Sequence, residues 1–303
     1  MELKTFIDLR SIIQYVCLGL LLCSASTTIG QVAQMQQSVY KELGVTEVSL
    51  ETQTIDSSML TGEVWVRERW QINEAGYLTE STSYDDDGKV KALLYNTYDQ
   101  DSLITHHRYI LQTADGRKIH DTEYTYDKHN RIKQTKHFYD DQLTAKGKHT
   151  YNQDGLLKRV KQKRYANHRI SSVKGKSEIQ YRYDSSGRLA GQSILRTGFS
   201  ETYAIGYSAD GLKKTTYKST SETTEKWLRD VQQENEYGQV ISSVYYLANP
   251  KTSKVTMAGI PYLRGDRRQT RYTYDDLGLV TTESIYKNDI LVQVKEYVYV
   301  FRE

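Results

Sequence analysis

Short stretches in which polar and apolar residues alternate recur along most of this sequence. Tyrosines stand two positions apart in several of them, as at Tyr124 with Tyr126 and Tyr272 with Tyr274. A spacing of two places both rings on the same face of a β-strand. Because rows of tyrosine and aliphatic residues on neighbouring antiparallel strands form one continuous apolar face, the pattern predicts an antiparallel sheet.

A turn motif separates these stretches, and its consensus is Tyr-Asp-x-x-Gly-x-aliphatic. The aspartate carboxylate can accept hydrogen bonds from the backbone of its own turn, and the glycine can adopt a positive φ. The motif therefore predicts tight β-turns, and the turn residues that it assigns are Asp85, Gly88, Asp127, Gly155, Asp184, Gly187, Gly211, Asp275 and Gly278.

Copies of the motif follow one another at intervals of about 14 residues, starting for example at positions 84, 98, 112 and 126. Each unit is predicted to contain a turn flanked by two short strands. The same unit builds a twisted sheet, a superhelical spiral or a closed barrel. An open flat sheet leaves two edges unpaired, so the pattern favours a strongly coiled sheet.

The unit Tyr-Asp-x-x-Gly-Arg-Leu resembles the YD repeat of the RHS (rearrangement hot spot) family, with its best match at Tyr183, Asp184, Gly187, Arg188 and Leu189. The similarity covers residues 70–299. In that family the repeats form a strand-turn-strand spiral, which in large toxins closes into a shell around a cargo domain. The resemblance also points to small exported bacterial YD-repeat proteins, for which carbohydrate binding has been proposed.

The predicted fold is therefore all-β. We expect an antiparallel β-meander of YD-type hairpin repeats that forms a coiled or solenoid-like sheet over residues 61–303. Residues 31–60 are predicted to be an N-terminal capping segment. It includes one short helix, because apolar residues in 31–43 recur near helical spacing, at Val32, Met35, Val39 and Leu43.

Residues 1–30 have the features of a secretory signal peptide. The apolar run 12–22 is shorter than the roughly 20 residues that span a bilayer, and small residues follow it, so cleavage is predicted after Ala25 or Gly30. Both cysteines, Cys17 and Cys23, lie in this segment, and the mature chain would have none. A short buried helix is the alternative, and Cys23 is a candidate for lipid attachment. The predicted location is the periplasm, the outer-membrane surface or the extracellular space, with no transmembrane segment after signal removal.

Catalytic and metal-binding patterns are not evident in the sequence. It has no nucleophile elbow, zinc-protease motif or phosphate loop. All seven histidines lie between His106 and His168, where we expect them to face solvent, and the carboxylates at 85–87 serve the turn motif. We therefore predict no enzyme activity, no catalytic residues, no metal and no cofactor. The net charge of +3 argues against nucleic acid as a partner.

One basic stretch stands out. Residues 155–177 contain eight Lys or Arg and no Asp or Glu. A strand here would place Arg159, Lys161 and Lys163 on one face and Arg164 on the other. The candidate binding residues are Lys158, Arg159, Lys161, Lys163, Arg164, Tyr165 and Arg169. They suggest a non-enzymatic module that binds glycans or polyanions, with an anionic polysaccharide or another envelope protein as partner. Two alternatives stay open: the lysines protect an exposed strand edge, or the protein is a structural or scaffolding component of an envelope assembly.

Overall fold

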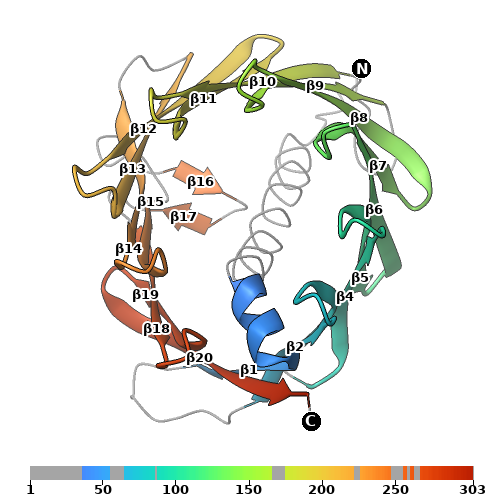
Figure 1. Cartoon of the computed structure of the whole chain (residues 1–303), viewed down its shortest axis with the longest axis vertical. Helices are drawn as coiled ribbons and strands as arrows, with labels where there is room; N and C mark the ends of the chain where they lie inside the picture. The colour runs from blue at the N-terminus through green and yellow to red at the C-terminus, as the bar shows by residue number, and fades with distance from the viewer. Residues whose placement is uncertain are drawn as a thin grey trace, which may run out of the picture.

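Eighteen antiparallel strands form one sheet that closes into a barrel (Figure 1). The computed structural model describes residues 36–54, 65–85, 87–165, 175–221, 226–246, 255–257, 260–262 and 267–302. The predicted signal peptide, both cysteines and Arg169 lie outside these residues. The strands are β1 Val45–Thr54, β2 Trp65–Ile72, β3 Leu78–Tyr84, β4 Val90–Tyr98, β5 Ile104–Thr113, β6 Gly116–Tyr126, β7 Ile132–Tyr139, β8 Gln142–Tyr151, β9 Leu157–Arg164, β10 Gly175–Tyr183, β11 Leu189–Arg196, β12 Phe199–Tyr207, β13 Lys213–Thr220, β14 Trp227–Glu234, β15 Val240–Tyr246, β16 Val255–Met257, β17 Ile260–Tyr262, β18 Arg267–Tyr274, β19 Val280–Lys287 and β20 Ile290–Phe301.

The prediction of a coiled or solenoid-like sheet is wrong, because the first and last strands pair with each other. Val48 lies opposite Tyr299 and Leu50 opposite Tyr297, while the other edge of β1 pairs with β2. Consecutive strands pair around the rest of the ring, with β15 next to β18. Closure removes both free edges of the sheet. The repeat motif acts between neighbouring strands and does not encode this contact between the two ends of the chain.

The prediction of two short strands per 14-residue unit is also wrong. Strands of the barrel run from 7 residues in β3 to 12 in β20, so one unit holds one strand and one turn. Successive motif copies therefore alternate between the two ends of the barrel. The turns that begin at Asp99 and Asp127 share one end, and the copy between them, around Gly116, lies at the other.

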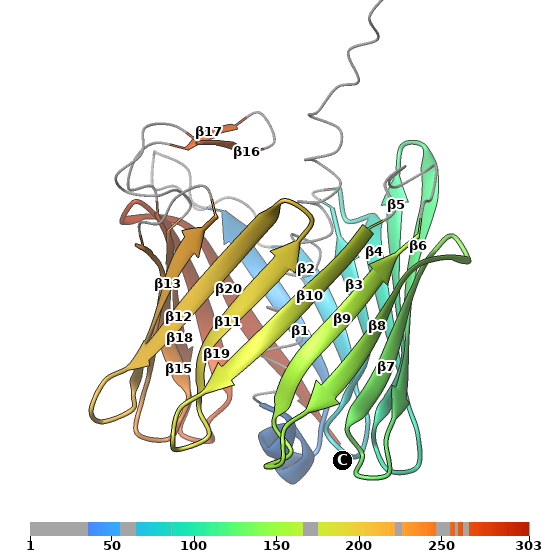
Figure 2. The same cartoon turned by 90° about the horizontal axis from the view of Figure 1, so that it is seen from above.

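The two ends of the barrel carry different connections (Figure 2). At one end, the turn rim, eight five-residue turns join the strand pairs; they span residues 73–77, 99–103, 127–131, 152–156, 184–188, 208–212, 235–239 and 275–279. At the other end, the loop rim, connections vary in length, and the one between β15 and β18 carries the hairpin β16–β17. The chain ends at the turn rim, where the helix also lies.

The predicted helix is present over residues 36–43 and lies within the ring beside β1 and β20 (Figure 1). Tyr40 is completely buried, with its ring 6.1 Å from that of Tyr299. Side-chain amides anchor the helix, since Gln36 Nε2 donates to the Gly278 carbonyl at 3.0 Å and Gln37 Nε2 to that of Ala75 at 3.3 Å. No helix among the described residues is long and apolar enough to cross a membrane.

The hydrophobic core lies on one side of the barrel. Its buried cluster consists of Tyr40, Val45, Val48, Leu50, Trp70, Ile72, Leu78, Leu94, Leu279, Val280 and Tyr297. We call this side, β18–β20 with β1–β5, the seam, and the opposite side, β9–β15, the far wall. The helix lies inside the ring, so the strand face that packs against it is the inner face. Residues that lie opposite one another on paired strands share a face, so the register identifies the inner residues of every strand. The residues that alternate with them along each strand point outward.

Candidate functional site

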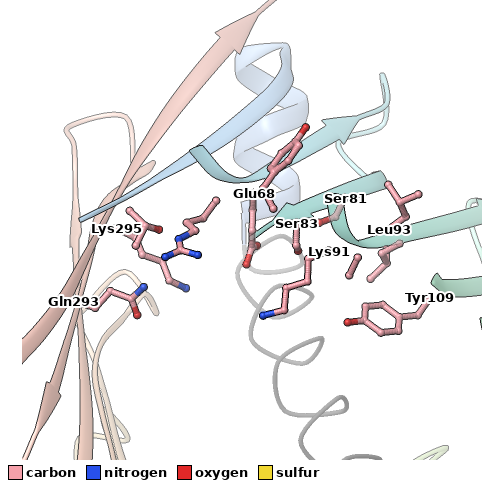
Figure 3. Close-up of a pocket in the computed structure, with 13 residues that line it drawn as sticks. Glu68, Ser81, Ser83, Lys91, Leu93, Tyr109, Gln293 and Lys295 are labelled. Carbon is pink, nitrogen blue, oxygen red and sulfur yellow. The ribbon is translucent and has the colours of Figure 1, made fainter. Parts of the chain in front are cut away.

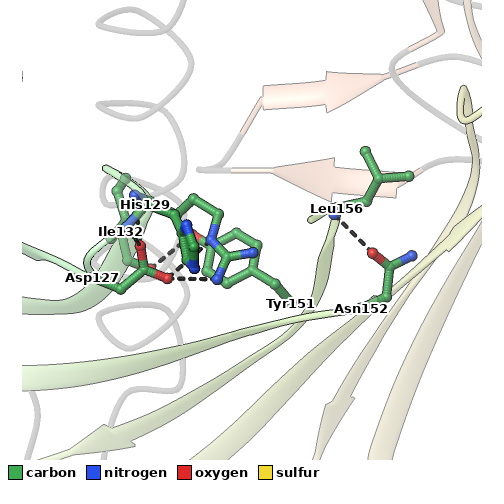
Figure 4. Close-up of polar contacts among 7 residues, drawn as sticks. Asp127, His129, Ile132, Tyr151, Asn152 and Leu156 are labelled. Atoms are coloured by element: carbon green, nitrogen blue, oxygen red, sulfur yellow. Dashed lines mark hydrogen bonds and ion pairs between the residues drawn. The ribbon is translucent and has the colours of Figure 1, made fainter. Parts of the chain in front are cut away.

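The turns of the turn rim are built from the motif side chains. In the turn at Asp127 its Oδ1 accepts the amides of His129 and Arg131 at 2.8 and 3.1 Å, and its Oδ2 accepts Arg131 Nη2 at 2.7 Å (Figure 4). The hydrogen bonds from the Arg131 side chain, with those from the backbone, lower the pKa of Asp127 to about 2. Asn152 begins the next such turn, and its Oδ1 accepts the Leu156 amide at 2.8 Å. Seven of the eight turns begin with such an Asp or Asn acceptor, and the turn at 208–212 begins with Ser208, whose hydroxyl accepts the Lys213 amide at 2.9 Å.

A tyrosine from each of seven strands ties its hairpin to the preceding one. The Tyr151 hydroxyl donates to the Ile132 carbonyl at 2.7 Å, and the Arg131 guanidinium lies 4.5 Å from the centre of the Tyr151 ring (Figure 4). We call this hydroxyl-to-carbonyl bond a tyrosine clasp. The clasps join Tyr98 to Leu78, Tyr126 to Ile104, Tyr151 to Ile132, Tyr183 to Leu157, Tyr207 to Leu189, Tyr274 to Val240 and Tyr299 to Val280. Each acceptor is the aliphatic residue that directly follows the preceding turn of the turn rim.

The nine turn residues assigned from the sequence fall into two groups. Asp85 and Gly88 lie at the loop rim, between β3 and β4. The other seven lie at the turn rim, and they are Asp127, Gly155, Asp184, Gly187, Gly211, Asp275 and Gly278. All five glycines have a positive φ, between 73° and 81°. These residues shape the backbone, so the chemistry of a binding surface has to come from elsewhere.

The basic residues assigned from the sequence do not share one face. Arg159, Lys161 and Lys163 of β9 point outward, and Lys161 and Lys163 are exposed. Lys158 lies at the β-bulge where β9 begins, beside Tyr181 and Tyr183. The register places Arg164 on the inner face. The ring centre of Tyr165 lies 5.0 Å from Lys163 Nζ.

Neighbouring strands add four lysines to the outward residues of β9, and sequence reasoning missed them. Lys146 lies directly opposite Lys163, which in turn faces Lys176 of β10, and Lys136 of β7 extends this row. In the next row Lys148 faces Lys161. The outer basic face consists of Lys136, Lys146, Lys148, Arg159, Lys161, Lys163 and Lys176. Its signal in the sequence is Lys-x-Lys on two adjacent strands, KGK at 146–148 and KQK at 161–163.

Few carboxylates neutralise this face. Lys136 Nζ lies 2.9 Å from Glu123 Oε2, and Glu178 lies 3.9 Å from both Arg159 and Lys161. Lys146, Lys148 and Lys163 form no ion pair with a carboxylate of the described chain. Like charges directly opposite one another on a sheet are destabilising.

The histidines do not all face solvent, contrary to the prediction. His107, His120, His137 and His149 lie half-buried on the inner face of β5–β8. Burial lowers the pKa of each of them, which favours the neutral form. His137 Nδ1 lies 3.1 Å from the Thr122 hydroxyl, so a neutral ring has a partner. Within the described ranges, no three His, Cys, Asp or Glu side chains are grouped as a metal site.

Comparisons with known proteins give structural likenesses of low similarity. Neither a protein-family model nor a curated protein matches the sequence. A porin-like protein from Bacteroides uniformis is 10% identical with a TM-score of 0.40, over 84% of this chain and 96% of that one. A TcdB2-TccC3-Cdc42 structure is 14% identical with a TM-score of 0.31, and the Photorhabdus luminescens Tc holotoxin pore is 15% identical with a TM-score of 0.32. This chain covers 14% of each toxin chain. Such similarities carry no argument about family or function, and membership of the RHS family stays a prediction.

Proposed function

We propose that this protein is an exported, non-enzymatic β-barrel that binds an anionic polysaccharide through its outer basic face. The observation that carries the proposal is the alignment of lysines from separate strands, Lys146, Lys163 and Lys176, in one outward row. Paired strands lie about 4.8 Å apart, so the row presents cations at regular short intervals. Carboxylate or sulfate groups along a polysaccharide would pair with them.

Edge protection does not explain these lysines. Charged residues are placed on strands whose edge is open to another chain. β9 pairs with β8 on one side and β10 on the other, so neither of its edges is open. The row therefore adds repulsion to the fold without protecting an edge, and binding of a polyanion gives a physical reason for it.

The charged side chains of the outer basic face favour an outer wall that is surrounded by water. A Lys or Arg that points into lipid near the bilayer midplane costs about 2–4 kcal/mol. Lys161 lies in the middle of β9, with its side chain 58% exposed. These charges support a barrel that stands in water in the periplasm, at the outer-membrane surface or outside the cell.

A heparin column tests the proposal. The full chain is compared with a variant carrying K146Q, K163Q and K176Q, and with a control of equal charge change carrying K89Q, K128Q and K213Q, all exposed residues in or beside turns. We expect the first variant to elute at clearly lower salt than the wild type and the control to elute near the wild type, because salt screens contacts to a polyanion.

Equal elution of both variants would show that only net charge matters and would contradict the site. A glycan array then identifies the natural anion. Recovery of one stoichiometric protein from envelope extracts, with no glycan retained, would favour the scaffolding alternative.

A further inference from the structure

A cavity of about 410 Å³ opens on the inner face of the seam (Figure 3). β20, β1 and β2 form one side of it, β3 and β4 its floor and β5 the opposite side. Pockets for small molecules begin at about 300 Å³, so one or two sugar rings fit this space. Its lining residues are Thr52, Arg67, Glu68, Ser81, Ser83, Tyr84, Lys91, Ala92, Leu93, Leu94, Tyr109, Gln293 and Lys295.

The cavity exists because small side chains occupy its floor. Ser83 of β3 lies opposite both Glu68 of β2 and Ala92 of β4 on the inner face. In the next row, Ser81 lies between Trp70 and Leu94. Two serines and an alanine therefore stand among the larger inner side chains of Trp70, Leu94 and Tyr109, and the wall is hollow there.

Polar side chains line this hollow, among them Thr52, Glu68 and Gln293. Thr52 is completely buried, and its hydroxyl has no hydrogen-bond partner within the described part of the chain. Because Thr52 has no exposed surface, the polar contacts of a ligand come from the other side chains of the lining. The Glu68 carboxylate is held at one side, where its Oε2 accepts Trp70 Nε1 at 3.3 Å.

Tyr109 supplies an aromatic surface on the opposite side of the cavity (Figure 3). Burial raises the pKa of Tyr109, and the Glu68 charge raises it further, so the two groups face the same space. Burial also raises the pKa of Glu68 itself, while the Lys295 charge and the hydrogen bond from Trp70 lower it. An aromatic ring surrounded by hydroxyls, an amide and a carboxyl group is a donor set suited to a sugar.

The charges around the cavity favour an acidic sugar. Three cations, Arg67, Lys91 and Lys295, line it against the single carboxylate of Glu68. Glu283 offsets one of them, since its Oε2 lies 3.2 Å from Lys295 Nζ. Lys91 forms no ion pair with a carboxylate of the described chain, and its amino group points into the space in Figure 3, so it would attract a carboxylate on the ligand.

We propose that this cavity binds an acidic saccharide of one or two rings. One sugar ring stacks on Tyr109, its hydroxyls bond to Ser83 and Gln293, and its carboxylate faces Lys91. The site is separate from the outer basic face, which suits a polymer. The inner wall surrounds the ligand, and the small side chains of Ser81 and Ser83 leave the space that it occupies.

Titration calorimetry on the full chain tests the site, with glucuronic acid and digalacturonic acid as acidic probes and glucose and maltose as neutral ones. We expect the acidic probes to bind at least about tenfold more tightly, as a charge-assisted hydrogen bond allows. S83L fills the hollow and should abolish binding, whereas S193L on the outer face of β11 should not. K91Q should weaken the acidic probes about tenfold, and K89Q, in the adjacent turn, should leave them unchanged.

Three results would overturn the proposal: no heat with either acidic probe, equal affinity for the neutral probes, or unchanged binding in S83L. The heparin variant with K146Q, K163Q and K176Q keeps the cavity intact, and S83L keeps the outer face intact. Failure of one site is therefore distinguishable from failure of the other.

Discussion

The seam and the far wall belong to one sheet but are stabilised in different ways. The seam contains almost all of the buried hydrophobic residues, from Tyr40 to Ile110 and from Leu279 to Tyr297. None of the buried hydrophobic residues of the described chain lies between 146 and 278. The far wall relies instead on strand pairing, fixed turns and tyrosine clasps such as Tyr183 to Leu157 and Tyr207 to Leu189. A repeat can thus extend a wall by local contacts, while closure requires a core made from both ends of the chain.

The largest expected effect is at the seam. Trp70 is 1% exposed and packs edge to face against Tyr297, with ring centres 6.0 Å apart. W70A should lower the free energy of unfolding by about 3–5 kcal/mol, because it leaves a large cavity. W227A on the far wall removes the same side chain from a half-buried position beside Arg229, and we expect it to cost less than about 2 kcal/mol. Denaturant unfolding measures both, and equal losses would contradict the one-sided core.

The next effect is at the turns. Gly187 has φ of 77°, where a Cβ is unfavourable by about 1–2 kcal/mol, so G187A should destabilise the protein by that amount. Gly206 of β12 has ordinary extended backbone, and no atom lies within 4 Å of the position that a Cβ would take. G206A should therefore change stability by less than about 0.5 kcal/mol. If G187A and G206A have the same free energy of unfolding, the backbone of the turns does not stabilise the far wall.

A single tyrosine clasp is expected to contribute less. Y183F removes the hydroxyl that donates to the Leu157 carbonyl at 2.9 Å, and the expected loss is about 0.5–1.5 kcal/mol. Tyr237 is 80% exposed in the turn before β15, so Y237F is the matched control and should leave thermal unfolding unchanged. No difference between the two variants would mean that the clasps do not stabilise the rim.

The inner histidines predict a pH dependence. Burial lowers the pKa of His137 from its ordinary value of 6.5, so below that pH the unfolded chain binds a proton that the folded chain does not. The stability contributed by the neutral ring is present above pH 6.5 and is lost as the pH falls. Thermal unfolding at about pH 7.5 and about pH 5.5 should show a smaller loss on acidification in H137N than in the wild type. H129N, at an exposed turn position, is the control and should follow the wild type.

Local features of the fold followed from the sequence, because each depends on neighbours in the chain. The alternation of Tyr124 and Tyr126 predicts a strand, and Asp184 with Gly187 predicts a turn. Closure depended instead on the pairing of Val48 with Tyr299, which no repeat spacing encodes. Strand length was underestimated because successive motif copies alternate between rims.

Only the part of the outer basic face that lies on a single strand could be predicted from the sequence. Arg159, Lys161 and Lys163 share a strand, so a period of two identified their common face. Lys146 and Lys176 join them only through the register of β8 and β10 with β9, which requires the structure. The inner cavity needed pairings across six strands and had no signal in the sequence.

The most direct test of the account measures stability and binding together in the variant with K146Q, K163Q and K176Q. Opposed lysines cost about 0.2–1 kcal/mol per pair, so the ligand-free variant should unfold at a higher temperature than the wild type. Its affinity for heparin should fall at the same time, because the row that repels itself is the row that binds the polyanion. A variant that is less stable than the wild type, or that keeps full affinity for heparin, would contradict the account.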